Sequence, residues 1–180
     1  MVNYRLATQE DAPAIAALHA QSWQHHYRGA FKQEYLDGPI IQERLEVWQK
    51  RMQQPNPNQY VLLAEEKNQL LGFACYFYDE DPTWGTLLDN LHVTFDRKRQ
   101  GIGKQLFQKG LAWSFEKDSN MPVYLWVLEN NDAAIAAYEK WKGRREDRKL
   151  HHNPDGGSAW ALRYVWNSSK KTKNNLIISN

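Results

Sequence analysis

The chain has 180 residues, a length that fits one domain with a sizeable core, and it carries a formal net charge of +2. A charge this small does not by itself indicate a nucleic-acid or acidic-membrane partner. Cys75 is the only cysteine, which excludes an internal disulfide and disfavours a cysteine-based zinc site. The opening MVNYRLATQEDAP has no apolar signal segment, and no apolar run approaches a membrane span, so we expect a cytoplasmic protein without a membrane partner.

The first third of the chain predicts one strand and two helices. A short strand is expected at 3–7, followed by a helix whose apolar stripe includes Ile15 and Leu18. A second helix is expected over 41–52, and the sequence PNPN at 55–58 ends it.

The middle of the chain predicts three strands and a helix. The segments 59–66 and 69–79 flank Lys67-Asn68, a turn-like pair that indicates a hairpin. A third strand is expected over 85–93. The segment 102–115 then has apolar residues at helical spacing.

The last third alternates between strand and helix. The apolar run over 122–128 is typical of a strand buried in a parallel sheet. Asn130 or Asn131 then caps the Ala-rich helix DAAIAAYEKW, and 158–166 is the last predicted strand. The composition predicts one domain over 1–166 and a polar C-terminal tail over 167–180. The order of elements favours an α/β protein with a mixed sheet and helices packed on its faces.

The stretch DRKRQGIGKQLF, from Asp96 to Phe107, joins a predicted strand to a predicted helix. Glycines that open a helix expose backbone amides, and the positive end of the helix dipole suits phosphate. The nucleotide P-loop pattern is absent, and Leu106 stands where the dinucleotide fingerprint needs glycine. The stretch therefore indicates either an anion site or a glycine turn that opens an ordinary helix.

Two motifs resemble signatures of the GNAT N-acetyltransferase superfamily. The run Lys98-Arg99-Gln100-Gly101-Ile102-Gly103 is similar to the family's Gln/Arg-x-x-Gly-x-Gly/Ala, with Lys98 in place of the usual Gln or Arg. NDAAIAAY, from Asn131 to Tyr138, resembles the family's Asn-x-x-Ala-x-x-x-Tyr, although the usual Gly-Phe that follows is displaced to Lys142-Gly143-Arg144. The resemblance covers residues 3–166 and implies a twisted, mostly antiparallel sheet with splayed parallel fourth and fifth strands and helices on both faces.

The resemblance also implies acetyl-CoA as acetyl donor, with coenzyme A as co-product. The pantetheine arm is expected beside the end of the fourth strand, the pyrophosphate on the amides after it, and positive side chains nearby. Tyr138 is expected beside the sulfur, where its phenol would protonate the departing thiolate. The cofactor-binding residues implied in this way are Leu91, His92, Val93, Lys98, Arg99, Gln100, Gly101, Ile102, Gly103, Lys104, Asn131 and Tyr138.

A second catalytic candidate is Asp89, a carboxylate within the apolar strand TLLDNLHV. Burying a carboxylate is unfavourable unless it is paired or lies in a cleft. Period-two alternation predicts Leu87, Asp89, Leu91 and Val93 on one face of the strand, with Asn90 and His92 on the other. Asp89 is therefore either the acceptor of the amine proton, directly or through water, or a salt-bridged aspartate; His92 is a weaker candidate for the same role.

The acceptor amine is expected near aromatic and acidic residues, because aromatic rings and carboxylates attract a cationic amine. Aromatic residues are more often part of a core, so this expectation competes with a purely structural role. The candidate substrate-binding residues are Trp23, Tyr27, Tyr76 and Trp84. The adjacent histidine pairs at 25–26 and 151–152 make poor chelates, and no metal site is expected.

The sequence therefore predicts an N-acetyltransferase that acts on a primary amine of a small molecule or peptide. Two alternatives stay open: a non-catalytic acyl-CoA-binding protein and, with less support, a nucleic-acid-binding module that uses the basic run at 144–149. That basic run is otherwise expected as a solvated hairpin or as a contact for a nucleotide 3′-phosphate. The apolar piece at 176–178 suggests a possible homodimer through a sheet edge.

Overall fold

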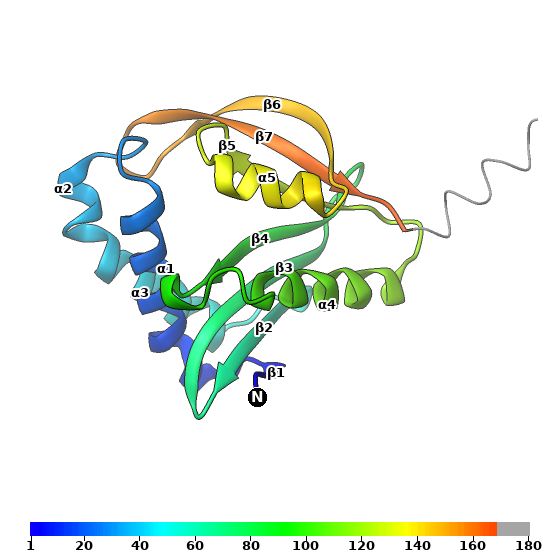
Figure 1. The fold of residues 1–180 in the computed structure, drawn as a ribbon, viewed down its shortest axis with the longest axis horizontal. Helices are drawn as coiled ribbons and strands as arrows, with labels where there is room; N and C mark the ends of the chain where they lie inside the picture. The colour runs from blue at the N-terminus through cyan, green and yellow to red at the C-terminus, as the bar shows by residue number, and fades with distance from the viewer. Residues whose placement is uncertain (169–180) are drawn as a thin grey trace, which may run out of the picture.

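The computed structural model describes residues 1–168, which form one seven-stranded sheet with helices on both faces (Figure 1). The strands run in the order β1-β2-β3-β4-β5-β7-β6. Every neighbouring pair is antiparallel except β4 and β5. The strands are β1 (Asn3–Leu6), β2 (Gln59–Glu66), β3 (Gln69–Asp81), β4 (Gly85–Val93), β5 (Val123–Leu128), β6 (Arg144–His152) and β7 (Ser158–Trp166). The helices are η1 (Gln9–Asp11), α1 (Ala12–His26), α2 (Gln33–Leu36), α3 (Pro39–Gln53), η2 (Phe95–Arg97), α4 (Ile102–Lys117) and α5 (Asp132–Lys140).

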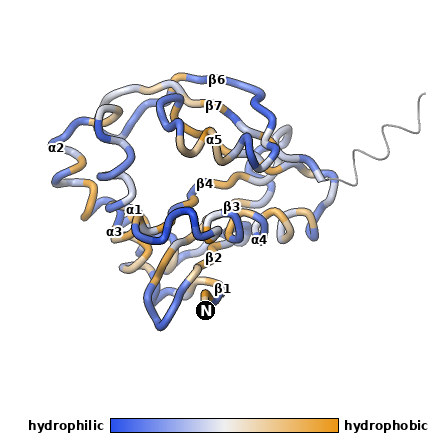
Figure 2. The backbone as a smooth tube through the Cα atoms, viewed as in Figure 1, coloured by the Kyte–Doolittle hydropathy of each residue, from blue (hydrophilic) through white to orange (hydrophobic). Residues whose placement is uncertain are grey.

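The predicted mixed sheet with splayed parallel fourth and fifth strands is confirmed. The predicted hairpin at Lys67-Asn68 is also confirmed, since both residues have positive φ, as a two-residue turn between β2 and β3 requires. Figure 2 shows hydrophobic residues along the central strands and hydrophilic residues at this turn. Of the tail predicted over 167–180, residues 169–180 lie outside the described residues, and the domain boundary stays a prediction.

The two faces of the sheet bury different helices. On one face Phe73 and Cys75 of β3 pack with Trp48 of α3 and with α1. On the other face Tyr76 packs with α4, in a cluster that α5 also joins. The ring of Tyr76 lies over Gly110, where any Cβ would come within 2.1 Å of Tyr76 Cζ. A glycine inside a helix therefore allows close packing of α4 against β3.

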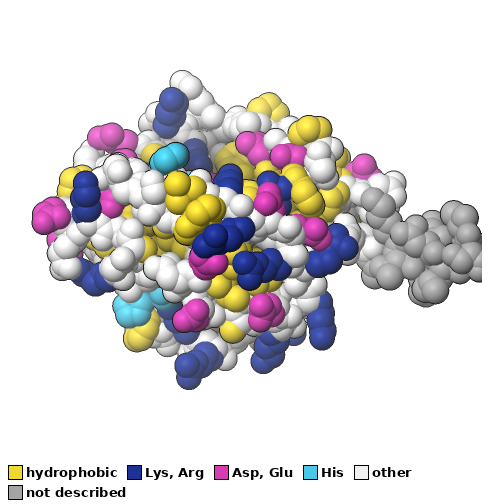
Figure 3. All heavy atoms as spheres, turned by 90° about the horizontal axis from the view of Figure 1, so that it is seen from above, with side chains coloured by type: hydrophobic (Ala, Val, Ile, Leu, Met, Phe, Trp, Pro, Cys, Tyr) yellow, Lys and Arg dark blue, Asp and Glu magenta, His cyan; other side chains and the backbone are white. Residues whose placement is uncertain are grey.

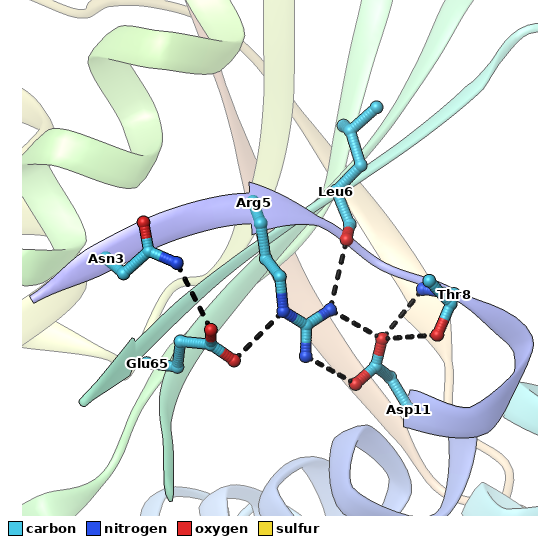
Figure 4. A network of polar contacts seen from close by, with 6 residues as sticks. All are labelled: Asn3, Arg5, Leu6, Thr8, Asp11 and Glu65. Carbon is cyan, nitrogen blue, oxygen red and sulfur yellow. Dashed lines mark hydrogen bonds and ion pairs between the residues drawn. The ribbon is translucent and has the colours of Figure 1, made fainter. Parts of the chain in front are cut away.

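A polar network fixes β1 against the start of α1 (Figure 4). The Arg5 guanidinium donates to both carboxylate oxygens of Asp11 at 2.8 Å and to Glu65 at 3.0 Å. Asp11 also accepts from the backbone N–H of Thr8 at 2.7 Å. These bonds hold the pKa of Asp11 at about 2, chiefly through the hydrogen bond from Arg5. The network ties together three segments that are far apart in sequence.

The basic run at 144–149, expected as a solvated hairpin, lies in the exposed strand β6, which forms an antiparallel hairpin with β7. A strand as such was not predicted there. All nine residues of β6 are exposed, so no hydrophobic alternation marks it as a strand. The short helix α2 was also not expected, and it buries Leu36 against Phe31.

The sheet opens between β4 and β5. The two strands pair only at Thr86 with Val123 and at Leu87 with Tyr124, and beyond those residues they diverge (Figure 1). The edge of β4 that faces β5 therefore carries backbone groups without a strand partner from Leu88 to Val93. Such an edge can pair with an extended ligand.

Candidate active site

A cleft of about 860 Å³ lies where β4 and β5 diverge. Its walls come from the ends of α1, β4 and β5, from the loop before α4, and from α5. It brings together most of the residues that the sequence nominated. Those that line it are Tyr27, Asp89, Leu91, His92, Val93, Lys98, Arg99, Gly101, Ile102, Gly103, Lys104, Asn131 and Tyr138.

The loop before α4 presents backbone amides to the cleft. Gly101 is the N-cap of α4 and has φ of +84°, a conformation that favours glycine. The first backbone hydrogen bond of this helix runs from the N–H of Gln105 to the carbonyl of Gly101 at 3.0 Å. The amides just before it therefore have no partner within the helix. A Cβ on Gly101 would meet nothing within 4 Å, so the loop faces open space that a ligand can fill.

The cleft is strongly basic near this loop. Among residues 1–168, five cations line this cleft, together with one carboxylate, that of Asp89. Lys98 Nζ lies 2.5 Å from His26 Nε2, and burial together with Lys98 lowers the pKa of His26 to about 4, so this histidine is neutral at pH 7. The potential here favours a polyanion such as a diphosphate. The five cations are Arg97, Lys98, Arg99, Lys104 and Lys140.

The helix α5 supplies Asn131 and Tyr138. Asn131 is the N-cap of α5, and its Oδ1 accepts from the Ala134 N–H at 3.2 Å. Tyr138 packs edge-on against Trp141 and Trp166. Burial raises the pKa of Tyr138, and Tyr27 raises it further. The Tyr138 phenol therefore stays protonated at neutral pH and can donate a proton into the cleft.

Asp89 lies in a β-bulge, and this overturns the predicted alternation of β4. Cys75 pairs with Asn90 while Tyr76 pairs with Leu88, so β4 has one extra residue here. Leu88, Leu91 and Val93 all pack on the α4 side, whereas Asp89 Oδ2 accepts from Arg51 Nη1 of α3 at 2.7 Å. The prediction that Asp89 shares a face with Leu91 and Val93 is therefore wrong, because the bulge shifts the register by one residue.

Three of the four predicted substrate-binding aromatics do not line the cleft. Tyr76 is fully buried and donates from its hydroxyl to the Phe107 carbonyl at 3.2 Å. Trp84 packs on the guanidinium of Arg163, with 4.3 Å between that group and the ring centroid. Trp23 packs among Phe31, Tyr27 and His19. Gln100, predicted to hold the cofactor, is exposed and also absent from the lining.

Several lining residues were not nominated from the sequence, among them Trp126 and Lys140. Ser22 Oγ lies 2.7 Å from His92 Nδ1, which fixes the ring of His92 from α1. Burial, with smaller contributions from His26 and Lys98, lowers the pKa of His92 to about 3, so this ring is neutral. The adjacent histidines at 25–26 stand out in the sequence. Their place in the cleft, however, follows from the packing of the end of α1 against β4, which the sequence does not reveal.

The described residues contain no helix of the length and apolarity that crossing a membrane requires. Within residues 1–168 no three His, Cys, Asp or Glu side chains gather in a way that could hold a metal ion.

The fold is that of N-acetyltransferases of known structure. The chain resembles the crystal structure of the PaiA N-acetyltransferase from Thermoplasma acidophilum in complex with coenzyme A, with a TM-score of 0.70. That alignment covers 92% of this chain and 99% of the other at 18% identity, so the likeness is one of fold.

Residues 20–143 match the model of the acetyltransferase (GNAT) family, and the chain belongs to this family. Two relatives agree. The chain is 27% identical over 137 residues to the uncharacterized N-acetyltransferase YuaI of Bacillus subtilis. That alignment covers 75% of this chain and 76% of YuaI. It is 26% identical over 157 residues to the probable N-acetyltransferase Rv2775 of Mycobacterium tuberculosis, with 87% of each chain covered. The chain is therefore an acyltransferase.

Proposed function

We propose that this protein transfers an acetyl group from acetyl-CoA to a primary amine of a small molecule or peptide. The observation that carries the proposal is the cleft at the divergence of β4 and β5, where a free strand edge leads to the amides that open α4. The residues present fit acetyl-CoA, because Lys98, Arg99 and Lys104 oppose its phosphates and the Gly101 loop faces open space. Bound acetyl-CoA supplies the thioester that the amine attacks.

The chain's own side chains have two roles in this proposal. Tyr138 holds a proton at its hydroxyl and gives it to the sulfur as the thiolate leaves. Asp89 Oδ2 is engaged by Arg51 and Asn90, so we assign Oδ1 to the amine or to a water beside it. The amine has to be neutral to attack, and Asp89 orients it and receives its proton directly or through that water. Leu91, His92 and Val93 offer the pantetheine arm a strand edge.

A non-catalytic acyl-CoA-binding protein would share the cofactor half of this site. The position of Tyr138 in the cleft, with its phenol protonated at neutral pH, favours the enzyme. The test measures the release of free coenzyme A with a thiol reagent over a panel of amines. The wild type and the Tyr138→Phe variant are assayed side by side. Turnover with at least one amine supports the enzyme, whereas tight acetyl-CoA binding without turnover supports the binder.

The cytoplasmic location, the possible homodimer and the absence of a nucleic-acid partner stay predictions from the sequence. Within the described residues the basic side chains of β6 do not line the cleft. Arg148 is paired with Glu129 at 2.7 Å, which leaves less positive charge on this strand for a phosphate backbone than the sequence suggested.

A further inference from the structure

Asp89 and Trp126 flank the gap between β4 and β5 on the same face of the sheet. The last paired residues of the two strands are Leu87 and Tyr124, and Asp89 and Trp126 each stand two residues further along. Asp89 contacts Arg51 of α3, and Trp126 packs against the cluster that includes Phe31. Both side chains thus lie on the face opposite α4 and α5, the side from which an acceptor can approach without crossing the cofactor.

Lys149 of β6 places a positive charge over the Trp126 ring. Its Nζ lies 4.1 Å from the ring centroid, and its side chain is exposed. No carboxylate within residues 1–168 comes within 4.0 Å of this ammonium. Arg163 contacts the same ring at 4.5 Å but is paired with Asp147 at 3.5 Å. Lys149 is therefore the cation here that lacks a protein counter-charge.

Across the gap from Lys149, the cleft is lined by one carboxylate of the described residues, Asp89 of β4. Asp81 of β3 lies at the closed end of the gap, where it pairs with Gly85 and its side chain accepts from the backbone N–H groups of Thr83 and Trp84. Figure 3, which views the molecule from the β6 side, shows Lys and Arg side chains beside Asp, Glu and hydrophobic side chains. A carboxylate on β4 and an ammonium group from β6 match the two ends of a zwitterion.

We propose that the acceptor is a free α-amino acid, held with its amine toward Asp89 and its carboxylate on Lys149. Lys149 does not itself line the cleft, but it lies over the ring of Trp126, which does. This inference rests on the acetyl transfer proposed above and names the substrate class for the acceptor end of that cleft. A polyamine or aminoglycoside fits poorly, because among residues 1–168 Asp89 is the one carboxylate that lines the cleft, so a second cationic group of the acceptor would have no carboxylate partner there. A second positive charge on the acceptor would also meet Lys149 and Arg163.

The experiment compares three acceptors that share a side chain: an L-amino acid, its primary amide and the corresponding decarboxylated amine, for alanine, leucine and phenylalanine. Values of kcat/KM are expressed per concentration of neutral amine, so that differences in amine ionisation do not enter. The wild type is expected to prefer the amino acid over its amide by about tenfold or more, the effect of one charge-assisted hydrogen bond. Lys149→Gln should remove this preference, mainly through the KM of the amino acid.

Two control variants make the test specific to the Lys149 charge. Lys149→Arg keeps the charge and should retain the preference. Arg148→Gln removes the neighbouring cation of β6, which stacks on Trp160 and pairs with Glu129, and should leave the preference unchanged. The KM for acetyl-CoA should be the same in all variants, since none of these residues lines the basic end of the cleft.

The outcomes separate this inference from the proposed function. If amides, simple amines or polyamines are acetylated as well as amino acids or better, the inference is wrong and the acetyltransferase stands. An unchanged preference in Lys149→Gln also overturns the inference. If acetyl-CoA does not bind, or no amine in a broad panel is acetylated, the proposed function itself fails.

Discussion

Arg51 of α3 donates from Nη1 to Asp89 Oδ2 at 2.7 Å and thereby anchors the bulged residue of β4 to the helix layer. The Arg51 guanidinium also lies 5.3 Å from the ring centroids of Trp48 and Phe77. Asp89 is consequently held in one place rather than free in the cleft. A carboxylate that is fixed in this way can orient an amine, because no conformational freedom of the carboxylate has to be lost when the amine binds.

Arg51→Gln is expected to lower kcat/KM for the acceptor by about tenfold, the effect of losing one charged hydrogen bond, while the Kd for acetyl-CoA changes little. Steady-state kinetics with the acceptor varied, together with titration of acetyl-CoA, gives both values. Arg51→Lys should recover part of the loss. An equal loss in acetyl-CoA affinity would show that Arg51 supports the whole cleft rather than the acceptor end.

Tyr138→Phe is expected to lower kcat by about 100-fold or more, because a general acid is lost, and to leave acetyl-CoA binding nearly intact. Since burial raises the pKa of Tyr138, kcat in the wild type should not fall on the alkaline side until above about pH 10. A pH profile of kcat measures this. An alkaline limb near neutral pH that persists in Tyr138→Phe would assign the proton to another group.

Gly110→Ala is expected to destabilise the protein by roughly 2 kcal/mol through overpacking, although alanine is ordinarily the better helix former. The reason is the Cβ that would come within 2.1 Å of Tyr76 Cζ. Chemical denaturation measures the free energy of unfolding, and Tyr76→Leu in the same chain should restore part of it. Gly103→Ala is the control, because its Cβ would stand 3.5 Å from Val93 Cγ2, an ordinary contact.

The Arg5–Asp11 pair should make stability depend on pH in the acid range. The pKa of Asp11 is about 2 in the folded protein, below its ordinary value of 3.8. The stabilisation is therefore complete above about pH 4 and is lost as the pH falls from there toward 2. Asp11→Asn should lose about 1–2 kcal/mol of unfolding free energy at pH 7, with a smaller difference at pH 3.

The control for Asp11 is the exposed Glu10, whose replacement by Gln removes a charge from the same 3-10 turn without breaking the Arg5 contacts. Asp11→Asn and Glu10→Gln should therefore differ at pH 7. A constant difference between wild type and Asp11→Asn from pH 7 to pH 3 would contradict the assigned pKa.

Most of the residues that the sequence nominated for the cofactor line one cleft, and the sequence could group them because its signals there are local. Gly101 opens a helix through its own backbone conformation, and the Asn131 to Tyr138 spacing lies within one helix. The β-bulge at Asp89 could not be predicted, since it is set by how β4 registers against β3. Tyr76 was misassigned because its burial depends on Gly110, a glycine in another element 34 residues away in the chain.

The proposed acceptor end of the cleft is formed by packing between segments that are far apart in the sequence. Trp126 alternates with buried residues of β5, and its contact with Lys149 arises only because β6 folds beside it. Strand β6 itself lacks a hydrophobic pattern, so its place at the sheet edge follows from its pairing with β7. Trp84 and Trp23 are aromatic packing residues, as most aromatics are.

The most direct test of the account is calorimetric titration of acetyl-CoA into the wild type and into Gly101→Val. Gly101 has φ of +84°, which valine adopts only with strain, so the amides that open α4 should lose their alignment. We expect the wild type to bind and the variant to bind about tenfold more weakly or worse, with its fold intact by circular dichroism. Equal affinity in the two proteins, or no binding by the wild type, would contradict the placement of the acetyl-CoA phosphates at this loop.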